Sequence, residues 1–383
     1  MDRFRVVICG GGIAAVEGLL RLRKLAGDSV DITIVAPNEE LILRPLAVRQ
    51  PFAGGAPARY PLARIAAGND AEWIQESLSS VDLEAQRALT DGDRQLGFDA
   101  LLVAVGARQV PPFDHVRTFR DADADEVFEG VVQDIEEGYS KSIAFLLPEG
   151  PVYPLPLYEL ALMTAERARS MSMDDLELTV VTPEPRPLNV FGPKVSDAVS
   201  GLLDRAGVTV LSSAKAHVPG VGRLVVTPPG TELRPQRMVA VPRLTGAAIG
   251  GLPGGGAHGF LPIDRFCSVK GTHGRVYAAG DAADFPVKHG GLGTEMADSA
   301  ASAIAVLAGQ DIKAEAFHPV IRAKLLGGKD PLYISARLVG ESGFESEVYD
   351  TPPWPEDEKV VAKELGGYLA TLDEGVRSIA GRA

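Results

Sequence analysis

Short apolar runs alternate along this chain with stretches in which apolar residues recur at helical spacing. The run Phe4–Cys9 is rich in β-branched residues and is followed directly by three glycines. After the glycines, Val16, Leu19 and Leu22 fall on one face of a predicted amphipathic helix. The run Val30–Val35 then predicts a second strand. The N-terminal pattern is therefore strand, helix, strand, which is typical of a parallel α/β sheet.

A second unit of the same kind begins in the middle of the chain. Residues 143–147 predict a strand, residues 157–169 a helix and residues 178–181 another strand. The segment TIVAPNE at residues 33–39 that closes the first unit is echoed by TVVTPEP at residues 179–185. We interpret this as an internal duplication of a βαβ nucleotide-binding half, with chance similarity of two short strands as the alternative.

These patterns predict an α/β chain with two Rossmann-like dinucleotide-binding domains and a small C-terminal segment. The Gly- and Pro-rich stretch 246–262 returns the chain from the second unit to the first. At the C-terminus, residues 359–383 carry leucines and valines at helical spacing. We expect a first domain in two parts, at residues 1–115 and 256–325, with a second domain between them at residues 116–255. Residues 326–383 are expected to form a C-terminal interface segment.

Composition narrows the classes of function. The chain has 383 residues and a net charge of −13, so it exceeds the usual size of a single core and lacks the basic face that nucleic-acid binding needs. No secretory signal precedes the first strand, and no apolar stretch is long enough to span a bilayer, so we expect a cytoplasmic protein and leave peripheral membrane contact open. Two cysteines cannot build a disulfide framework, and the six histidines lack metal-ligand spacing.

The glycines after the first strand form a dinucleotide-binding fingerprint. GGGIAA at residues 10–15 fits Gly-x-Gly-x-x-Gly/Ala between a strand and a helix. Gly10 permits the tight turn, Gly12 permits close approach of a pyrophosphate, and Ala15 permits close packing of helix and strand, while the helix N-terminus faces the anion. The acidic residue that usually binds ribose at the end of the second strand is replaced by Ala36, and Asn38 or Glu39 is the candidate substitute.

A second motif lies far away in the sequence. GRVYAAGD at residues 274–281 is a predicted strand ending in Gly-Asp, and FDALLVAVG at residues 98–106 is another apolar strand ending in glycine. With the first motif, these segments resemble the pyridine nucleotide-disulfide oxidoreductases, whose two-domain arrangement is that of glutathione reductase. The resemblance implies bound FAD, with Asp281 at its ribityl and pyrophosphate region and Gly106 near the adenine-side phosphates.

Three further segments are most similar to sulfide:quinone oxidoreductases, the flavoprotein subunit of flavocytochrome c sulfide dehydrogenase and type II NADH dehydrogenases. They are LRPL at residues 43–46, FPVKHGG at residues 285–291 and PLPLYE at residues 154–159. The resemblance implies that the first segment packs beside the isoalloxazine and that Lys288 and a helix N-terminus face its pyrimidine ring. A cation there would stabilise the negative charge of the reduced flavin. His289 is a candidate proton donor or ring contact. Tyr153 and Tyr158 are candidates to face the ring from the second domain, with packing in the core as the alternative for both.

The sequence departs from these families where their chemistry depends on cysteine or glycine. Tyr153 and Leu261 stand near the places of the two sulfide-oxidising thiols, and residues 39–44 lack a cysteine that could tether FAD covalently. We expect Cys9 and Cys267 to be buried and inert. The second unit has the proline-rich loop 148–156 instead of a glycine fingerprint, so its NAD site is expected to be eroded.

The hypothesis is therefore an oxidoreductase that passes two electrons through non-covalent FAD to a quinone or another small-molecule acceptor, without cysteine-based sulfide oxidation. The alternatives are an NAD(P)H:quinone reductase of the type II NADH dehydrogenase kind, and a non-enzymatic or redox-sensing flavoprotein. We expect a homodimer and no metal. The candidate catalytic residues are Lys288 and His289. The candidate cofactor-binding residues are Gly10, Gly12, Ala14, Ala15, Ala36, Pro37, Asn38, Arg44, Pro45, Ala104, Val105, Gly106, Gly280, Asp281, Lys288, Gly291 and Leu292.

Overall fold

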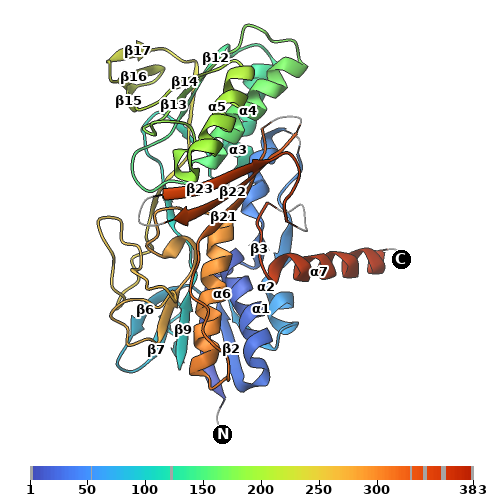
Figure 1. Ribbon diagram of the computed structural model, residues 1–383, viewed down its shortest axis with the longest axis vertical. Helices are drawn as coiled ribbons and strands as arrows, with labels where there is room; N and C mark the ends of the chain where they lie inside the picture. Colours follow the sequence, from blue (N-terminus) through green and yellow to red (C-terminus); the bar gives the residue numbers. More distant parts are fainter. Residues whose placement is uncertain are drawn as a thin grey trace.

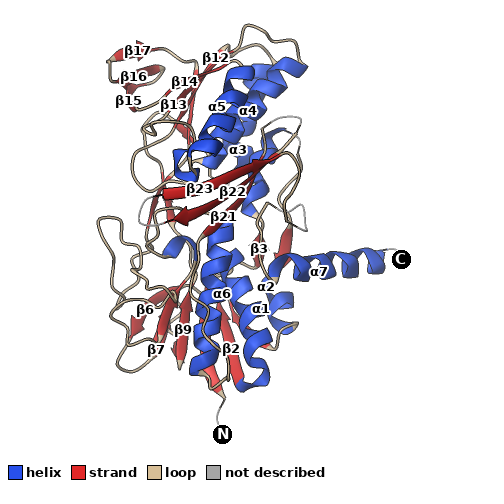
Figure 2. Ribbon diagram, viewed as in Figure 1, coloured by secondary structure: helices blue, strands red, loops and turns tan. Residues whose placement is uncertain are grey.

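Two α/β lobes stack along the long axis of the molecule (Figure 1). The computed structural model describes residues 3–52, 54–120, 124–327, 330–339, 343–354 and 359–380. Each lobe contains a parallel sheet with helices packed on it (Figure 2). The predicted α/β fold class is confirmed.

The lower lobe is built on a five-stranded parallel sheet. Its strand order is β20-β9-β1-β2-β5, with β1 at Phe4–Cys9, β2 at Val30–Val35, β5 at Ala71–Ile74, β9 at Ala100–Val103 and β20 at Val276–Ala278. All four residues of β9 and the last four of β1 are buried, because a parallel sheet is covered on both faces. The predicted first and second strands are confirmed at the expected residues.

Helices α1 (Ile13–Ala26) and α6 (Gly290–Leu307) lie side by side on one face of this sheet (Figure 1). They come from opposite ends of the chain and approach the sheet closely because small residues line the contact. A Cβ atom on Gly18 of α1 would meet Leu102 Cδ2 at 2.6 Å and the Cβ atom of Ala297 in α6 at 3.7 Å. The distant Gly-Asp motif thereby reaches the first glycine loop.

The upper lobe repeats this plan. Its parallel sheet has the order β11-β18-β12-β13-β14, with β11 at Arg117–Thr118, β12 at Ser142–Leu146, β13 at Glu177–Val181, β14 at Val208–Leu211 and β18 at Arg237–Ala240. In the lower sheet β1 lies between β2 and the later strand β9, and in the upper sheet β12 lies between β13 and the later strand β18. The echo between the two units is thus a shared topology. The lobe's helices are α3 (Ala124–Glu136), α4 (Leu155–Ser170) and α5 (Pro193–Arg205).

An antiparallel sheet of β21 (Val320–Leu325), β22 (Leu332–Val339) and β23 (Gly343–Tyr349) lies between the lobes in Figure 1. β21 falls within the range 256–325 that was expected to complete the first domain, whereas β22 and β23 fall within the expected C-terminal segment, so this sheet contains strands from both predicted parts. The division into domains by residue number stays a prediction. The smaller elements are β3 (Glu40–Ile42), β4 (Arg59–Pro61), α2 (Leu62–Ala67), β6 (Leu78–Asp82), β7 (Arg87–Thr90), β8 (Gln95–Gly97), β10 (Arg108–Val110), β15 (Lys215–Gly220), β16 (Arg223–Thr227), β17 (Thr231–Leu233) and β19 (Arg243–Thr245), and the 3-10 helices η1 (Gly27–Ser29), η2 (Arg44–Phe52), η3 (Asn189–Phe191) and η4 (Gly280–Ala282).

The C-terminal helix α7 (Leu365–Ala380) extends sideways from the lower lobe (Figure 1). Its N-terminus is held by Glu17, a buried residue of α1 whose carboxylate accepts the backbone N–H groups of Lys363, Glu364 and Leu365 at 3.0, 3.0 and 2.7 Å. Glu17 therefore satisfies amides that a helix end leaves without intrahelical partners. These amides lie 346 to 348 residues further along the chain and belong to the start of α7, not to α1.

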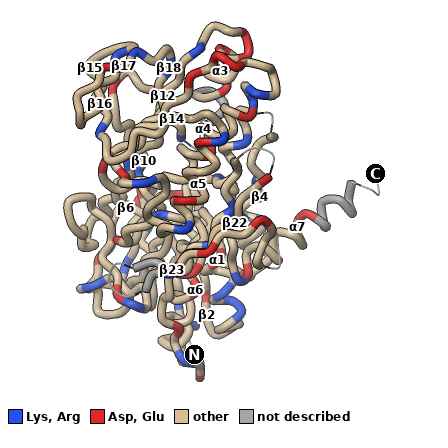
Figure 3. The backbone as a smooth tube through the Cα atoms, turned by 45° about the horizontal axis from the view of Figure 1, so that its top comes forward, with Lys and Arg blue, Asp and Glu red and all other residues tan. Residues whose placement is uncertain are grey.

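Acidic and basic residues are interspersed over both lobes (Figure 3). Among the described residues, no helix is long and apolar enough to cross a membrane. The described part of the chain also contains no group of three His, Cys, Asp or Glu residues arranged to hold a metal ion.

Candidate functional site

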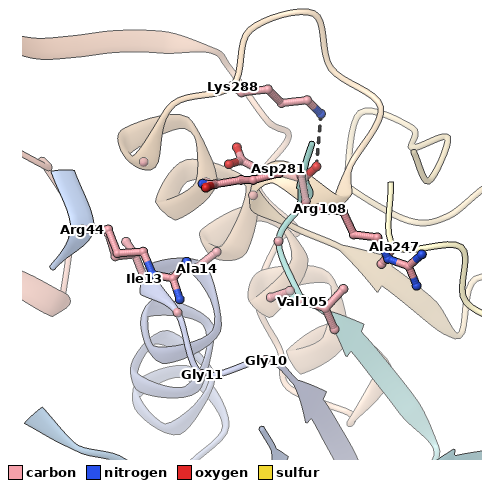
Figure 4. Close-up of a pocket in the computed structure, with 18 of the residues that line it drawn as sticks. Gly10, Gly11, Ile13, Ala14, Arg44, Val105, Arg108, Ala247, Asp281 and Lys288 are labelled. Carbon is pink, nitrogen blue, oxygen red and sulfur yellow. Dashed lines mark hydrogen bonds between the residues drawn. The ribbon is translucent and has the colours of Figure 1, made fainter. Parts of the chain in front are cut away.

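A cavity of about 580 Å³ lies at the carboxyl ends of β1, β2, β9 and β20 (Figure 4). In the sheet, β1 has β2 as its neighbour on one side and β9 on the other, so the strand order reverses direction at β1, next to the cavity. Open α/β sheets bind their ligands at this kind of switch point. The volume falls within the range of roughly 300–1,000 Å³ that is usual for ligand and cofactor sites.

The glycine loop forms one wall of the cavity. Gly10 has φ +130°, and a Cβ atom there would lie 2.2 Å from the carbonyl oxygen of Ala104, so only glycine fits this position. Gly12 is the N-cap of α1, makes no side-chain cap, and a Cβ atom on it would project into open space. The N-terminal amides of α1 are thus bordered by free volume in the cavity wall, which suits a pyrophosphate.

Asp281 closes the cavity from the side of the second motif. In Figure 4 it lies above the N-terminal end of α1, with Arg44 and Arg108 on either side. Gly280, at φ +70°, brings η4 against α1, since a Cβ atom there would meet the Cβ atom of Ala14 at 3.2 Å. Burial raises the pKa of Asp281, and the nearby Lys288 opposes that rise. A partly buried carboxylate that faces a cavity calls for hydrogen-bond donors from a ligand, such as ribose or ribityl hydroxyls.

Lys288 enters the cavity as a buried cation. Its ammonium group donates to the backbone carbonyls of Asp281 at 3.2 Å and Ala283 at 2.5 Å and lies 3.6 Å from the ring centroid of Phe260. Burial lowers its pKa to about 8, while Asp281 and Asp284 favour the charged form. At neutral pH most molecules therefore carry a positive charge here.

His289 is neutral in this environment. Burial, and then the charge of Lys359, lower its pKa to about 4. Its Nδ1 accepts the backbone N–H of Gly291 at 3.0 Å, so it caps α6 and the remaining ring proton is on Nε2. The Tyr153 and His289 rings form an edge-to-face contact at a centroid distance of 5.7 Å. His289 can donate a hydrogen bond through Nε2, whereas the amide of Gly291 is already used by His289.

A buried ion pair stands beside His289. Lys359 donates to both carboxylate oxygens of Glu159 at 2.7 and 2.8 Å, and the backbone N–H of Leu326 donates to Glu159 at 2.9 Å. The side chains are only 5% and 1% exposed. Both residues line the cavity. They join α4 of the upper lobe to the segment that precedes α7.

A second cavity of about 370 Å³ lies behind this pair. It shares Pro45 and Lys359 with the first cavity. Its wall is mostly apolar and comes from η2, the end of β21 and the first turns of α7. The residues that line it are Leu43, Pro45, Leu46, Arg49, Lys324, Leu326, Lys359, Val360, Leu365, Gly366 and Leu369.

The structure brings most of the predicted site residues into one cavity. Those that line it are Gly10, Gly12, Ala14, Pro37, Asn38, Arg44, Pro45, Ala104, Val105, Gly106, Gly280, Asp281, Lys288 and His289. Ala15, Ala36, Gly291 and Leu292 do not line the cavity, because each is buried behind its wall. Of the two candidate substitutes for the ribose-binding acid, Asn38 lines the cavity and Glu39 does not, while Glu40 does.

Other residues of the cavity wall were missed from the sequence. They come from β6 and the residue before it, from β10 and the residue before it, and from β19 and the long return loop that follows it. They include Ser77, Leu78, Ser79, Ala107, Arg108, Gln109, Leu244, Ala247, Ala248 and Ile249. The return loop is fixed to β6 by hydrogen bonds from Val81 N to Gly250 O at 2.8 Å and from Gly250 N to Ser79 O at 3.2 Å. No sequence motif marks such pairings between distant segments.

Two expectations about aromatic and sulfur residues are settled by burial. Tyr153 lines the cavity, whereas for Tyr158 the alternative of core packing holds, since that side chain is fully buried in the upper core and its hydroxyl donates to Glu184 at 2.6 Å. Cys9 and Cys267 are buried free cysteines, as predicted, and burial raises the pKa of each thiol to about 12. A thiol that stays protonated is a poor nucleophile.

Solved structures with this fold include several oxidoreductases. No protein-family model matches the chain, and no curated protein matches it in sequence. The sulfide:quinone oxidoreductase of the hyperthermophilic bacterium Aquifex aeolicus superposes with a TM-score of 0.81 and 17% identity, over 91% of this chain and 87% of that one. The ferredoxin reductase for the CYP199A2 system of Rhodopseudomonas palustris gives 0.66 and 20%, over 90% and 88%. NDH2 from Plasmodium falciparum gives 0.60 and 14%, over 75% and 66%. The expected resemblance is thus confirmed as a shared fold, and the chain has the two-lobed architecture of these oxidoreductase structures.

Proposed function

We propose that the chain is an FAD-dependent oxidoreductase that transfers an electron pair from a small-molecule donor to a small-molecule acceptor. The observation that carries this proposal is the single cavity in which the glycine loop, the N-terminus of α1 and Asp281 converge, although Gly10 and Asp281 are 271 residues apart. Bound FAD would supply the redox chemistry, since protein side chains alone provide little. The shared fold with a sulfide:quinone oxidoreductase supports the same reaction class.

The residues present fit a dinucleotide cofactor. Gly12 and the amides of α1 would hold the pyrophosphate, Asp281 would accept hydrogen bonds from hydroxyl groups, and Asn38 would lie toward a ribose. Lys288 would place a positive charge where the reduced cofactor gains negative charge, and the Nε2–H of His289 would donate a hydrogen bond nearby. Pro45 would separate the cofactor from the second cavity.

We propose a quinone as the acceptor and the second cavity as its site. That cavity is largely apolar and shares a wall with the first, so a flat apolar molecule could receive electrons there without displacing the cofactor. Cysteine-based sulfide oxidation is not part of the proposal, because the two thiols of the chain are buried away from the cavity lining. Cytoplasmic location and a homodimer stay predictions.

The NAD(P)H:quinone reductase alternative finds less support in the upper lobe. Glu149, in the loop where a glycine fingerprint would stand, is exposed and pairs with Lys215 at 2.8 Å. Glu184 follows β13, at the place of a ribose-binding acid. Its carboxylate, however, accepts a hydrogen bond from the Tyr158 hydroxyl, and partial burial raises its pKa. A nucleotide ribose would have to break that hydrogen bond.

Anaerobic stopped-flow mixing tests the proposal. The purified protein is expected to contain about one FAD, released unmodified on denaturation, and to lose flavin absorbance when mixed with its donor. NADH, NADPH and sulfide are the first donors to try, followed by oxidation with a quinone. A colourless protein that cannot be reconstituted with FAD would overturn the proposal. Bound FAD that is rapidly reduced by NADH would favour the reductase alternative, and bound FAD that none of these donors reduces would favour the non-enzymatic one.

A further inference from the structure

The return loop at residues 246–262 places an aromatic ring beneath the buried cation of the first cavity. Phe260, near the end of this loop, is 3% exposed, and the ammonium group of Lys288 lies over its ring at 3.6 Å from the centroid. A cation within about 6 Å of an aromatic face is attracted by the electron-rich face of the ring. Phe260 does not itself line the cavity, so it can act on a ligand there only through Lys288.

Phe260 is held against the segment that binds Lys288. The residue after it pairs with that segment on both sides, since Leu261 N donates to Ala282 O at 2.9 Å and Asp284 N donates to Leu261 O at 2.7 Å. The two carbonyls that accept the lysine belong to the same segment. The ring and the carbonyls are therefore parts of one hydrogen-bonded unit, which fixes the ammonium group between them.

Burial works against the charge on Lys288. It lowers the pKa of the lysine to about 8, whereas the carboxylates of Asp281 and Asp284 favour the charged form. Asp284 is exposed, so solvent and salt screen its charge, and burial raises the pKa of Asp281 itself. The carboxylates therefore compensate for burial only in part. The face of the Phe260 ring favours the ammonium form without the need to bury a second charge.

We propose that Phe260 is a positioning residue of the redox site, whose ring holds the ammonium group of Lys288 in place and favours its charged form. The inference rests on the proposed function, because the charge of Lys288 serves the reduced cofactor. It gives the return loop a part in setting the reduction potential. The ring should extend to higher pH the range in which the lysine carries its charge.

The pKa of Lys288, measured on the purified full chain, tests the inference directly. NMR titration of protein isotope-labelled at the lysine ε-carbon gives this value, and Lys288→Met assigns the signal. Pentafluorophenylalanine at position 260 keeps an apolar ring of nearly the same shape but withdraws electrons from its face. This replacement and Phe260→Leu should each lower the pKa of Lys288 by about one pH unit.

The flavin reduction potential is the second readout, in protein that holds FAD. The excess of the wild-type potential over that of Lys288→Met should decline as the lysine loses its proton. In both Phe260 variants this decline should occur about one pH unit lower, while at more acidic pH their potentials should match the wild type. A ring that merely fills space would not move the pH of this decline.

The same two substitutions at Phe266 are the matched control. Arg265 lies over that ring at 4.8 Å, and neither residue lines the first cavity, so the pKa of Lys288 should stay unchanged. An unchanged pKa of Lys288 in the folded pentafluorophenylalanine protein would overturn the inference, even if Phe260→Leu lowered it, because packing alone would then explain the loss. An equal fall in the Phe266 variants would overturn it as well. A chain that binds no FAD fails the proposed function instead, and the titration of Lys288 still decides whether the ring acts on the lysine.

Discussion

Removing Lys359 should destabilise the protein much more than removing a surface lysine. In Lys359→Met, the buried carboxylate of Glu159 loses two hydrogen bonds and its counter-charge and keeps only the N–H of Leu326. Breaking a buried ion pair on one side typically costs about 3–5 kcal/mol. For a chain of 383 residues, such a loss corresponds to a fall in melting temperature of roughly 4–6 °C.

The pH dependence gives the prediction a sign. Burial raises the pKa of Glu159, and Lys359 opposes this rise, so the pKa in Lys359→Met should be higher still. A carboxyl group whose folded pKa lies above its unfolded value loses stability as pH rises between those two values. The penalty of Lys359→Met should therefore be larger at pH 8 than at pH 5, where Glu159 can take up a proton.

Thermal unfolding followed by circular dichroism at both pH values measures these effects. The double variant Glu159→Leu/Lys359→Met should recover most of the lost stability. Its free energy of unfolding should lie within about 1.5 kcal/mol of the wild-type value, because replacing both buried charges removes the desolvation cost. Lys141→Met is the control, since Lys141 pairs with Asp175 on the surface and both side chains are 61% exposed. A Lys359→Met protein as stable as the Lys141→Met protein, or a double variant whose loss equals the sum of the single losses, would refute the reasoning.

Three further predictions concern the cofactor. Asp281→Ala should weaken FAD retention roughly a hundredfold, through loss of about 2–3 kcal/mol of charged hydrogen bonding, whereas Glu149→Ala should retain FAD; equal occupancy after desalting would place the site elsewhere. Lys288→Met should lower the two-electron reduction potential of the flavin by about 40 mV, for about 2 kcal/mol of lost charge stabilisation. Because the pKa of Lys288 is about 8, this difference from the wild-type potential should vanish as pH rises well above 8. Dye-equilibration titrations measure both potentials. Replacing both Cys9 and Cys267 with Ser should leave reduction of the flavin by its donor intact once folding is verified, and loss of that reduction in a folded variant would restore a thiol mechanism.

The local elements of this protein were largely predictable from sequence. The strands at Phe4–Cys9 and Val30–Val35 have the predicted bounds, since a largely buried parallel strand is a short run rich in apolar and β-branched residues. The glycine loop could be predicted for a similar reason, because Gly10 adopts a backbone conformation and a closeness to Ala104 that a side chain would prevent. Patterns with one steric cause and short range are visible in the chain itself.

Contacts across long sequence distances were decided by the tertiary structure alone. Burial, rather than residue type, determined that Tyr158 serves the core while Tyr153 faces the cavity, and that Glu17 caps the distant α7. The ion pair of Glu159 and Lys359 joins residues 200 positions apart, and no local sequence pattern could predict it. Sequence determined which segments become strands, helices and glycine turns, because local sterics and apolar periodicity act over a few residues. Packing of the two lobes and the C-terminal segment determined which side chains meet, because desolvation and charge pairing depend on what surrounds a residue in space.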